Sequence, residues 1–370
     1  MIRVLHLIDH LGSGGAQTAL LNLLRYRDPA RFECVVASMH GRGPMAAEFE
    51  ALGLPVVSLS ARRWPPLYLF ALPRLLRTQR FDVVHFHLFG ANWIAKPIAW
   101  LFGCRVLFNH DQCNDALRDK GLFLLLDRLT NRLSSKILAV SRSIVRFLGE
   151  KENIPAQLIE YFPNGVDVRS FPPATPASRK AARERWSLPA DAFIVGGIGR
   201  LVAQKDFSFF LEIAVLLHAQ EPQVHFVIFG DGPEEMNLKK RCRILGLESR
   251  FTFAGYVSER SAIYQAIDLL LLTSRYEGTP MVLLEAMVSL VPIVATAVDG
   301  TAEILTSSRS ALLFQLGEEV AGMEAVLALL RDPALRSRLA IQAQFDALEH
   351  FDAEKQMKLL ESLYDSALSA

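Results

Sequence analysis

Residues 269–287 read LLLLTSRYEGTPMVLLEAM, a strand pattern, a short Gly/Pro loop and a helix pattern in succession. The apolar run 269–273 is typical of a buried strand. A glycine-containing loop that leads into a helix N-terminus forms a natural anion site, because the first backbone N–H groups of a helix have no partner within it. Glu277 lies in this loop and Glu285 lies about one turn into the helix. Both carboxylates can therefore accept hydrogen bonds from hydroxyl groups near the anion. An anion with hydroxyls on either side describes a nucleotide sugar.

Strand and helix patterns alternate along both halves of the chain. The strand candidates are residues 3–8, 32–39, 55–59, 82–86, 105–108 and 136–140 in the first half, and 193–198, 224–229, 251–254, 269–273 and 293–296 in the second. This rhythm is typical of doubly wound parallel sheets, an α/β fold. A proline-rich stretch at 168–178 separates the halves.

Two Rossmann-like domains, 1–170 and 178–350, are therefore expected, facing each other across a cleft. The candidate ligand-binding loops follow strands, and ligands of open α/β sheets lie beyond the carboxyl ends of the strands. From residue 317 onwards the pattern is wholly helical.

The composition of the 370 residues is that of a globular protein, with 51% hydrophobic and 21% charged residues. No apolar stretch of transmembrane length lacks charge or proline, and the first residues show no signal-peptide pattern. The four cysteines have no metal-ligand spacing. These features predict a cytoplasmic location with reduced thiols.

Positive charge is concentrated in the first half. Residues 1–170 carry 21 Lys and Arg against 14 Asp and Glu, and residues 171–370 carry 19 against 25. Residues 61–80 hold five arginines and no acid, with Trp64, Tyr68 and Phe70 between them. This pattern suits an anionic membrane surface, but it equally suits an ordinary sheet-covering helix with a solvated basic face. Nucleic-acid binding is not expected, because the excess is modest and no known module pattern is present.

Arg200 and Lys205 follow the first strand of the second half at a spacing that lets both reach one anion. Arginine offers a planar fork of donors and lysine a point charge. Together they could neutralise a diphosphate leaving group as its charge grows. The alternative is a pair of exposed surface cations.

Histidines and glycines supply the candidates in the first half. Gly14 and Gly15 follow the first strand in GSGG, which lets the backbone approach a phosphate or a sugar closely, although an ordinary tight turn would look the same. His110 ends a strand, where it could donate to a sugar or orient an acceptor hydroxyl; a structural histidine is the alternative. His85 and His87 alternate along another strand, and structural roles are favoured because no third metal ligand is evident.

At these residues the chain resembles the retaining GT-B glycosyltransferases of family 4. Glu277 and Glu285, separated by seven residues, match the family's most specific motif. The other matching segments, in the right order, are 163–167 (PNGVD), 199–205 (GRLVAQK), 230–233 (GDGP) and 255–257 (GYV). The resemblance runs from the first strand nearly to the end of the chain.

The resemblance implies roles for individual residues. Arg200 and Lys205 would bind the diphosphate, and Glu285 would bind the ribose. Glu277 would hold the donor sugar and His110 would serve as the histidine of the first domain's site. The remaining implied donor contacts are Gly14, Gly15, Tyr256, Val257, Gly278, Thr279, Pro280 and Met281. The C-terminal helix, about 352–368, would pack back on the first domain.

Two positions depart from the family pattern. Gln17 replaces an acidic residue that often follows the Gly-Gly pair, and Asp299 precedes Gly300 where Gly-Gly is usual. No two aspartates are separated by a single residue, so the metal-binding motif of metal-dependent glycosyltransferases is absent. No obligatory metal or other cofactor is therefore expected.

The sequence thus predicts retaining transfer of a sugar from a nucleoside diphosphate, UDP or GDP, to a lipid-linked or glycan hydroxyl. Assembly of bacterial envelope polysaccharide, O-antigen or exopolysaccharide is the expected setting, with binding to the inner face of the membrane through 61–80 left open. Two alternatives remain. A non-hydrolysing sugar-nucleotide epimerase is disfavoured by the Glu277/Glu285 motif, and a non-catalytic binding scaffold is disfavoured by the intact Arg200 and Lys205.

Overall fold

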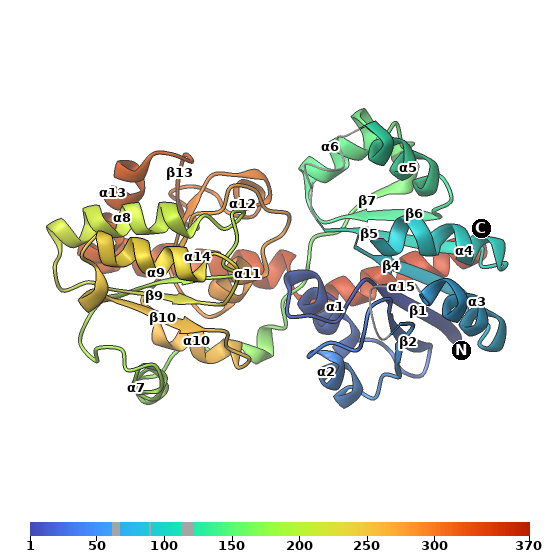
Figure 1. The fold of residues 1–370 in the computed structure, drawn as a ribbon, viewed down its shortest axis with the longest axis horizontal. Coiled ribbons are helices and arrows are strands. Elements are labelled where there is room, and N and C mark those ends of the chain that lie inside the picture. The colour runs from blue at the N-terminus through green and yellow to red at the C-terminus, as the bar shows by residue number, and fades with distance from the viewer. Residues whose placement is uncertain (61–66, 89, 113–120) are drawn as a thin grey trace. The chain divides into compact units, whose positions relative to one another are not determined.

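The computed structural model describes residues 1–60, 67–88, 90–112 and 121–370. The chain divides into two compact α/β units. Unit 1 comprises residues 1–165 and 353–370, and unit 2 comprises residues 166–352. Each unit is built on one parallel sheet with helices on both of its faces (Figure 1).

Unit 1 contains a seven-stranded sheet in the order β3-β2-β1-β4-β5-β6-β7, and every neighbouring pair is parallel. Its strands are β1 (Ile2–Ile8), β2 (Phe32–Ser38), β3 (Val56–Ser58), β4 (Val83–His87), β5 (Val106–Asp111), β6 (Lys136–Ala139) and β7 (Ile159–Tyr161). Its helices are α1 (Gly15–Arg25), α2 (Ala46–Ala51), α3 (Tyr68–Thr78), the π-helical turn η1 (Ala91–Ala95), α4 (Lys96–Leu101), α5 (Gly121–Asn131), α6 (Arg142–Glu150) and α15 (Ala353–Ser369).

The alternation of side chains along β1 builds a separate core on each face of this sheet. Val4 and Ile8 pack with α1, α2 and α15 on one face. Leu5 and Leu7 pack with α3, η1 and α4 on the other. His6 shares its face with Val4 and Ile8, and this face becomes important for the histidines described below.

Unit 2 contains a six-stranded parallel sheet in the order β10-β9-β8-β11-β12-β13. Its strands are β8 (Ile194–Ile198), β9 (His225–Phe229), β10 (Phe251–Gly255), β11 (Leu269–Leu272), β12 (Ile293–Thr296) and β13 (Leu312–Phe314). Its helices are α7 (Pro176–Arg185), α8 (Phe207–Gln220), α9 (Glu235–Ile244), α10 (Arg260–Ala266), α11 (Met281–Val288), α12 (Asp299–Ile304), α13 (Glu319–Arg331) and α14 (Pro333–His350). The predicted α/β class with two Rossmann-like sheets is confirmed.

The boundary between the units lies at residue 165, five residues before the predicted end of the first domain. The stretch 168–178 is not a free linker. Residues 168–170 form a short 3₁₀ turn, the Phe171 ring lies 5.7 Å from that of Tyr264, and α7 begins at Pro176. Packing of one aromatic side chain therefore brings the proline-rich segment into unit 2.

The C-terminal helix α15 belongs to unit 1 and lies against α1. The Tyr364 hydroxyl lies 2.5 Å from Nδ1 of His85, and Glu361 accepts a hydrogen bond from the backbone N–H of Asp28. The chain therefore leaves unit 1 after residue 165 and returns to it at residue 353.

Candidate active site

The candidate donor-binding residues of unit 2 follow four neighbouring strands of one parallel sheet. Arg200 follows β8, Gly230 follows β9, Tyr256 follows β10 and Glu277 lies in the loop after β11. Because carboxyl ends of parallel strands lie at one edge of the sheet, these loops share that edge.

Two glycines fix the loop that carries Arg200. A Cβ atom on Gly230 would lie 1.9 Å from the carbonyl oxygen of Gly199, and one on Gly232 would lie 2.5 Å from that of Leu201. Both glycines have positive φ angles, of 139° and 155°. The loops after β8 and β9 therefore pack backbone against backbone, which leaves the exposed Arg200 on a rigid base.

Lys205 and Glu277 form the polar centre of this edge. The Lys205 ammonium donates to Oε1 of Glu277 at 2.5 Å, and both side chains are largely buried. The neighbouring residues also bind each other, since the Gln204 side chain donates to the carbonyl of Tyr276 at 3.0 Å. The structure therefore brings together two predicted site residues that lie 72 positions apart in the sequence. Lys205 is the predicted ligand of the diphosphate, and Glu277 is the predicted ligand of the donor sugar.

The backbone of residues 277–278 is held in place by α12. The N–H of Gly300 donates to the carbonyl of Glu277 at 3.2 Å, and a Cβ on Gly300 would lie 1.4 Å from the carbonyl oxygen of Gly278. Asp299 adopts a φ of 27°, a conformation that favours glycine. Where Gly-Gly is usual, this chain thus keeps Gly300, which the close approach of the two backbones needs. Asp299 before it adopts a strained backbone conformation.

Helix α11 begins at Met281, directly after the Gly-Thr-Pro loop, and the N-cap Pro280 makes no side-chain cap. Gly278, Thr279 and Met281 are all buried beside Glu277. The first N–H groups of this helix and the positive end of its dipole therefore adjoin the Lys205–Glu277 pair.

Glu285 is buried within α11, and both of its oxygens have partners. Arg260 donates to Oε1 at 2.5 Å and the Tyr264 hydroxyl donates to Oε2 at 2.8 Å. Burial raises the pKa of Glu285, and the Arg260 charge opposes that rise. Each carboxylate oxygen can accept two hydrogen bonds, and the contact of Glu285 with ribose hydroxyls stays a prediction.

Arg260 and Tyr264 were not identified from the sequence. Both lie on α10, which begins three residues after Val257. Tyr256, which is exposed, and Val257, which is half-buried, lie in the loop between β10 and this helix. The only signal for Arg260 was its position directly after the segment expected to contact the base.

In unit 1, Gly14 is the extended N-cap of α1, which begins at Gly15. Gln17 is buried in the first turn of this helix, and its amide donates to the carbonyl of His10 at 3.0 Å. A carboxylate at this position has no N–H to donate and could not make that bond. The glutamine that departs from the family pattern therefore has a structural role, as a donor to the His10 carbonyl. Gly14 and Gly15 thus lie at the N-terminus of α1, and their contact with a phosphate or a sugar stays a prediction.

His110 is 1% exposed at the end of β5, and neither of its ring nitrogens has a hydrogen-bond partner among the described residues. Burial lowers its pKa to about 3. Its ring stacks 5.5 Å from that of His85. The residue is therefore a neutral imidazole in this structure, and its predicted contact with substrate stays a prediction.

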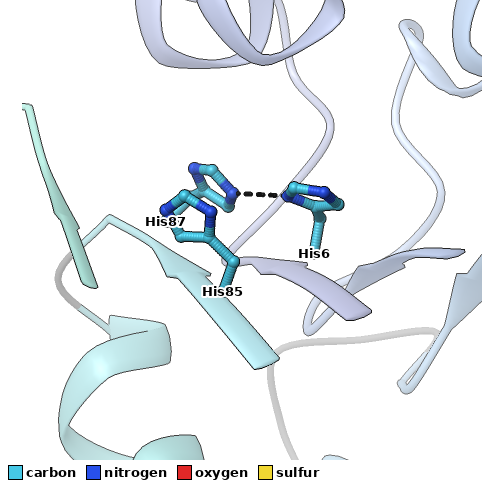
Figure 2. Close-up of side chains that lie close together, drawn as sticks. All are labelled: His6, His85 and His87. Carbon is cyan, nitrogen blue, oxygen red and sulfur yellow. Dashed lines mark hydrogen bonds between the residues drawn. The ribbon is translucent and has the colours of Figure 1, made fainter. Parts of the chain in front are cut away.

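His6, His85 and His87 point towards one another from two adjacent strands (Figure 2). Nδ1 of His6 lies 3.1 Å from Nε2 of His87, and all three rings are buried. The sequence showed no third ligand beside the HxH pair, because His6 becomes a neighbour only through the register of β1 against β4.

These three histidines are the one group of potential metal ligands found in residues 1–60, 67–88, 90–112 and 121–370. Their ligand atoms lie within 4.8 Å of one another. A tetrahedral zinc ion with bonds of ~2.1 Å needs ligand atoms ~3.4 Å apart, so the rings would have to close in to bind one. As placed, they form a hydrogen-bonded imidazole cluster.

Comparisons with known proteins agree with this geometry. The family model described as "Glycosyltransferase Family 4" matches residues 13–170, and the model described as "Glycosyl transferases group 1" matches residues 178–345. Together the two models match most of the chain.

Similar proteins and structures show the same architecture over most of their length. EpsF of Bacillus subtilis is 28% identical over 303 residues, which cover 78% of each chain. The UDP-Gal:alpha-D-GlcNAc-diphosphoundecaprenol alpha-1,3-galactosyltransferase of Escherichia coli is 23% identical over 80% of this chain and 78% of its own. The crystal structure of Anabaena Alr3699/HepE in complex with UDP-glucose has a TM-score of 0.86 at 22% identity and covers 99% of this chain and 100% of its own.

The fold is thus that of the GT-B glycosyltransferases. The two family models fall on the two units, one on each. The chain belongs to the group 1 glycosyltransferases, family 4.

Proposed function

We propose that this glycosyltransferase moves a sugar from a nucleoside diphosphate to a hydroxyl acceptor with retention of configuration at the anomeric carbon. The observation that carries the proposal is the Lys205–Glu277 pair beside the start of α11. A cation and the first backbone N–H groups of a helix suit a diphosphate, and a carboxylate at the same sheet edge suits the hydroxyls of the attached sugar. Arg200 lies on the adjoining loop.

The chemical step follows from these positions. The acceptor hydroxyl attacks the anomeric carbon on the face from which the diphosphate leaves. Lys205 and Arg200 stabilise the negative charge that grows on the leaving group. Glu277 holds hydroxyls of the transferred sugar, since Lys205 bonds to its Oε1 and a carboxylate has a second acceptor oxygen.

Supply of two protein cations makes a metal ion unnecessary for this step. We propose that Arg200 and Lys205 perform the charge neutralisation that a divalent cation provides in metal-dependent enzymes. Activity is then expected to survive dialysis against EDTA without loss.

We infer a UDP-sugar as donor and a lipid-linked diphosphate as acceptor. The Anabaena structure with this fold is a complex with UDP-glucose, and the Escherichia coli relative is named for a diphosphoundecaprenol acceptor. The excess of Lys and Arg in residues 1–170 suits an anionic acceptor. Assembly of a bacterial envelope polysaccharide is the corresponding setting.

The donor is tested by thermal shift with UDP-, GDP-, ADP- and dTDP-sugars on wild type and Lys205→Ala. A donor at 100 times its dissociation constant adds ~2.7 kcal/mol, a shift of a few degrees. We expect the UDP-sugar shift to be lost in Lys205→Ala. The matched control is Lys239→Ala, which removes a surface lysine paired with Glu235 at 2.6 Å outside the site.

Product analysis separates the remaining alternatives. We expect NMR of the glycoside to show the anomeric configuration of the donor sugar. Formation of an altered donor without acceptor would instead indicate an epimerase. Donor binding without turnover on any lipid diphosphate would indicate a scaffold and contradict the proposal.

A further inference from the structure

Helix α5 in unit 1 has its polar side buried and its apolar side exposed. Asp127 and Asn131 are fully buried, whereas Leu122 is 67% exposed and Leu125 and Leu129 are about half exposed. Leu122, Leu125 and Leu129 recur at helical spacing, so they form one stripe. A helix on the surface of a globular domain normally shows the opposite arrangement.

Hydrogen bonds hold this orientation in place. Nε1 of Trp93 donates to Asp127 at 2.6 Å. Asn131 accepts from Lys96 at 3.0 Å and donates to Glu152 at 2.7 Å. Rolling the helix to cover the leucines would break these buried contacts, each of which is costly to leave unmade. The exposed leucine stripe is therefore built into unit 1.

Exposed apolar side chains are also present on the two preceding helices. Phe70 of α3 is 79% exposed and Leu101 at the end of α4 is 71% exposed. α3 contacts α4, and α5 contacts η1, the turn that runs into α4. We call this surface the α3–α5 face. It consists of Leu67, Leu69, Phe70, Ile94, Trp100, Leu101, Leu122, Phe123, Leu125 and Leu129.

Exposed arginines lie on α3 and shortly after α4 and α5. The exposed cations are Arg74, Arg77, Arg105 and Arg132. The Arg105 guanidinium lies 5.5 Å from the centre of the Trp100 ring. The only acidic residue in α3, η1, α4 and α5 is Asp127, which is buried.

We propose that unit 1 binds an anionic lipid bilayer through the α3–α5 face. The leucine, phenylalanine and tryptophan side chains enter the boundary between headgroups and acyl chains, and the arginines bind lipid phosphates. A two-fold interface with a second copy is disfavoured, because it would bring like-charged arginines together and the described residues of α3, η1, α4 and α5 offer no exposed carboxylate to pair them. The proposal goes beyond sugar transfer and names how the enzyme reaches a bilayer.

This surface is broader than the segment 61–80 that the sequence indicated. Residues 61–66 lie outside the described residues, and α4 and α5 supply six of the ten apolar side chains. None of the described helices is long and apolar enough to cross a bilayer.

Vesicle flotation of the full-length protein tests the proposal. Phosphatidylcholine vesicles, with or without one third phosphatidylglycerol, are compared at low and high salt. We expect wild type to float with the anionic vesicles at low salt, and Leu122→Gln/Leu125→Gln/Leu129→Gln to lose at least roughly ten-fold in partition. The matched control is Ile341→Gln/Phe345→Gln on α14 of unit 2, two side chains that are 61% and 57% exposed.

Equal partition of the triple variant and the control would overturn the proposal, as would failure of wild type to float. A concentration-dependent dimer that the triple variant abolishes would assign the face to a second copy and would also overturn it. Donor thermal shift is read on every variant. Retained donor shift without flotation removes the bilayer proposal alone, and flotation without donor shift removes the proposed function alone.

Discussion

Arg260 is the partner that lets Glu285 be charged in a fully buried position. Burial raises the pKa of this carboxyl, and the arginine is the largest influence that lowers it. The Tyr264 hydroxyl contributes a second hydrogen bond, and its own pKa is raised by burial and by Glu285. A carboxylate held by two partners in this way has a fixed geometry, which the predicted contact with ribose hydroxyls would require.

Removal of Arg260 should therefore destabilise unit 2 in a pH-dependent manner. Without it the pKa of Glu285 rises further in the folded state, so the cost of the buried charge is present above that pKa and falls as the carboxyl protonates. We expect Arg260→Ala to lower the free energy of unfolding by about 2 kcal/mol at pH 8, and by clearly less at pH 5. This loss of stability is smaller than the ~3–5 kcal/mol that breaking a deeply buried ion pair costs, because Arg260 is partly solvated.

Urea denaturation at the two pH values measures this effect. The control is Arg243→Ala, which breaks a well-exposed pair with Glu248 and should leave the free energy of unfolding nearly unchanged at both pH values. The same loss at pH 5 and pH 8 would show that Arg260 acts by packing and not through the charge of Glu285.

The sequence offered candidate site residues where one short segment contains the whole motif. Glu277 and Glu285 lie within one loop and helix, and Lys205 follows one strand. Arg260 and His6 were missed because their partners come from other elements, so only strand register and helix packing bring them together. The burial of Asp127 and the exposure of Leu125 were also unpredictable, since helical spacing alone does not say which side of α5 faces the sheet.

At the scale of elements, α12 sets the position of the loop that carries Glu277. The two backbones approach so closely at Gly300 that no side chain fits between them. The sequence predicted this loop and α11 correctly, because the apolar strand and helix patterns are long. It missed β7 and β13, which have three residues each and lie at sheet edges, although it found β3, an edge strand of the same length.

A methyl group at Gly300 should displace α12 from the loop. We expect Gly300→Ala to abolish the donor thermal shift and to lower the free energy of unfolding by about 1–3 kcal/mol, the cost of overpacking. The control is Gly149→Ala in α6, where a Cβ meets nothing within 4 Å. That change should be neutral or stabilise by up to ~1 kcal/mol, and a full donor shift in Gly300→Ala would contradict the role of α12.

Across the whole molecule, the two units differ in how many buried neutral histidines they contain. In unit 1, burial lowers the pKa of His6 and of His110 to about 3, and burial lowers those of His85 and His87 well below the ordinary value. Among the described histidines of unit 2, a lowered pKa is found for His225, at about 4. The histidine cluster therefore makes unit 1 the acid-sensitive half.

Unit 1 should lose stability before unit 2 as the pH falls. Below pH ~6.5 the unfolded chain binds protons that the folded histidines do not, so each such histidine removes about 1.4 kcal/mol per pH unit until its folded pKa is reached. Asp9 in unit 1 has a raised pKa from burial and offsets part of this loss below its own pKa. Hydrogen exchange with mass spectrometry at pH 7.5 and pH 5.5, corrected for intrinsic rates, should show protection falling in β1, β4, β5 and α15 while β8 and β11 remain protected. His87→Gln should reduce the difference, whereas replacement of the exposed His350 by Gln should not; loss of protection in unit 2 first would contradict the assignment of acid sensitivity to the cluster.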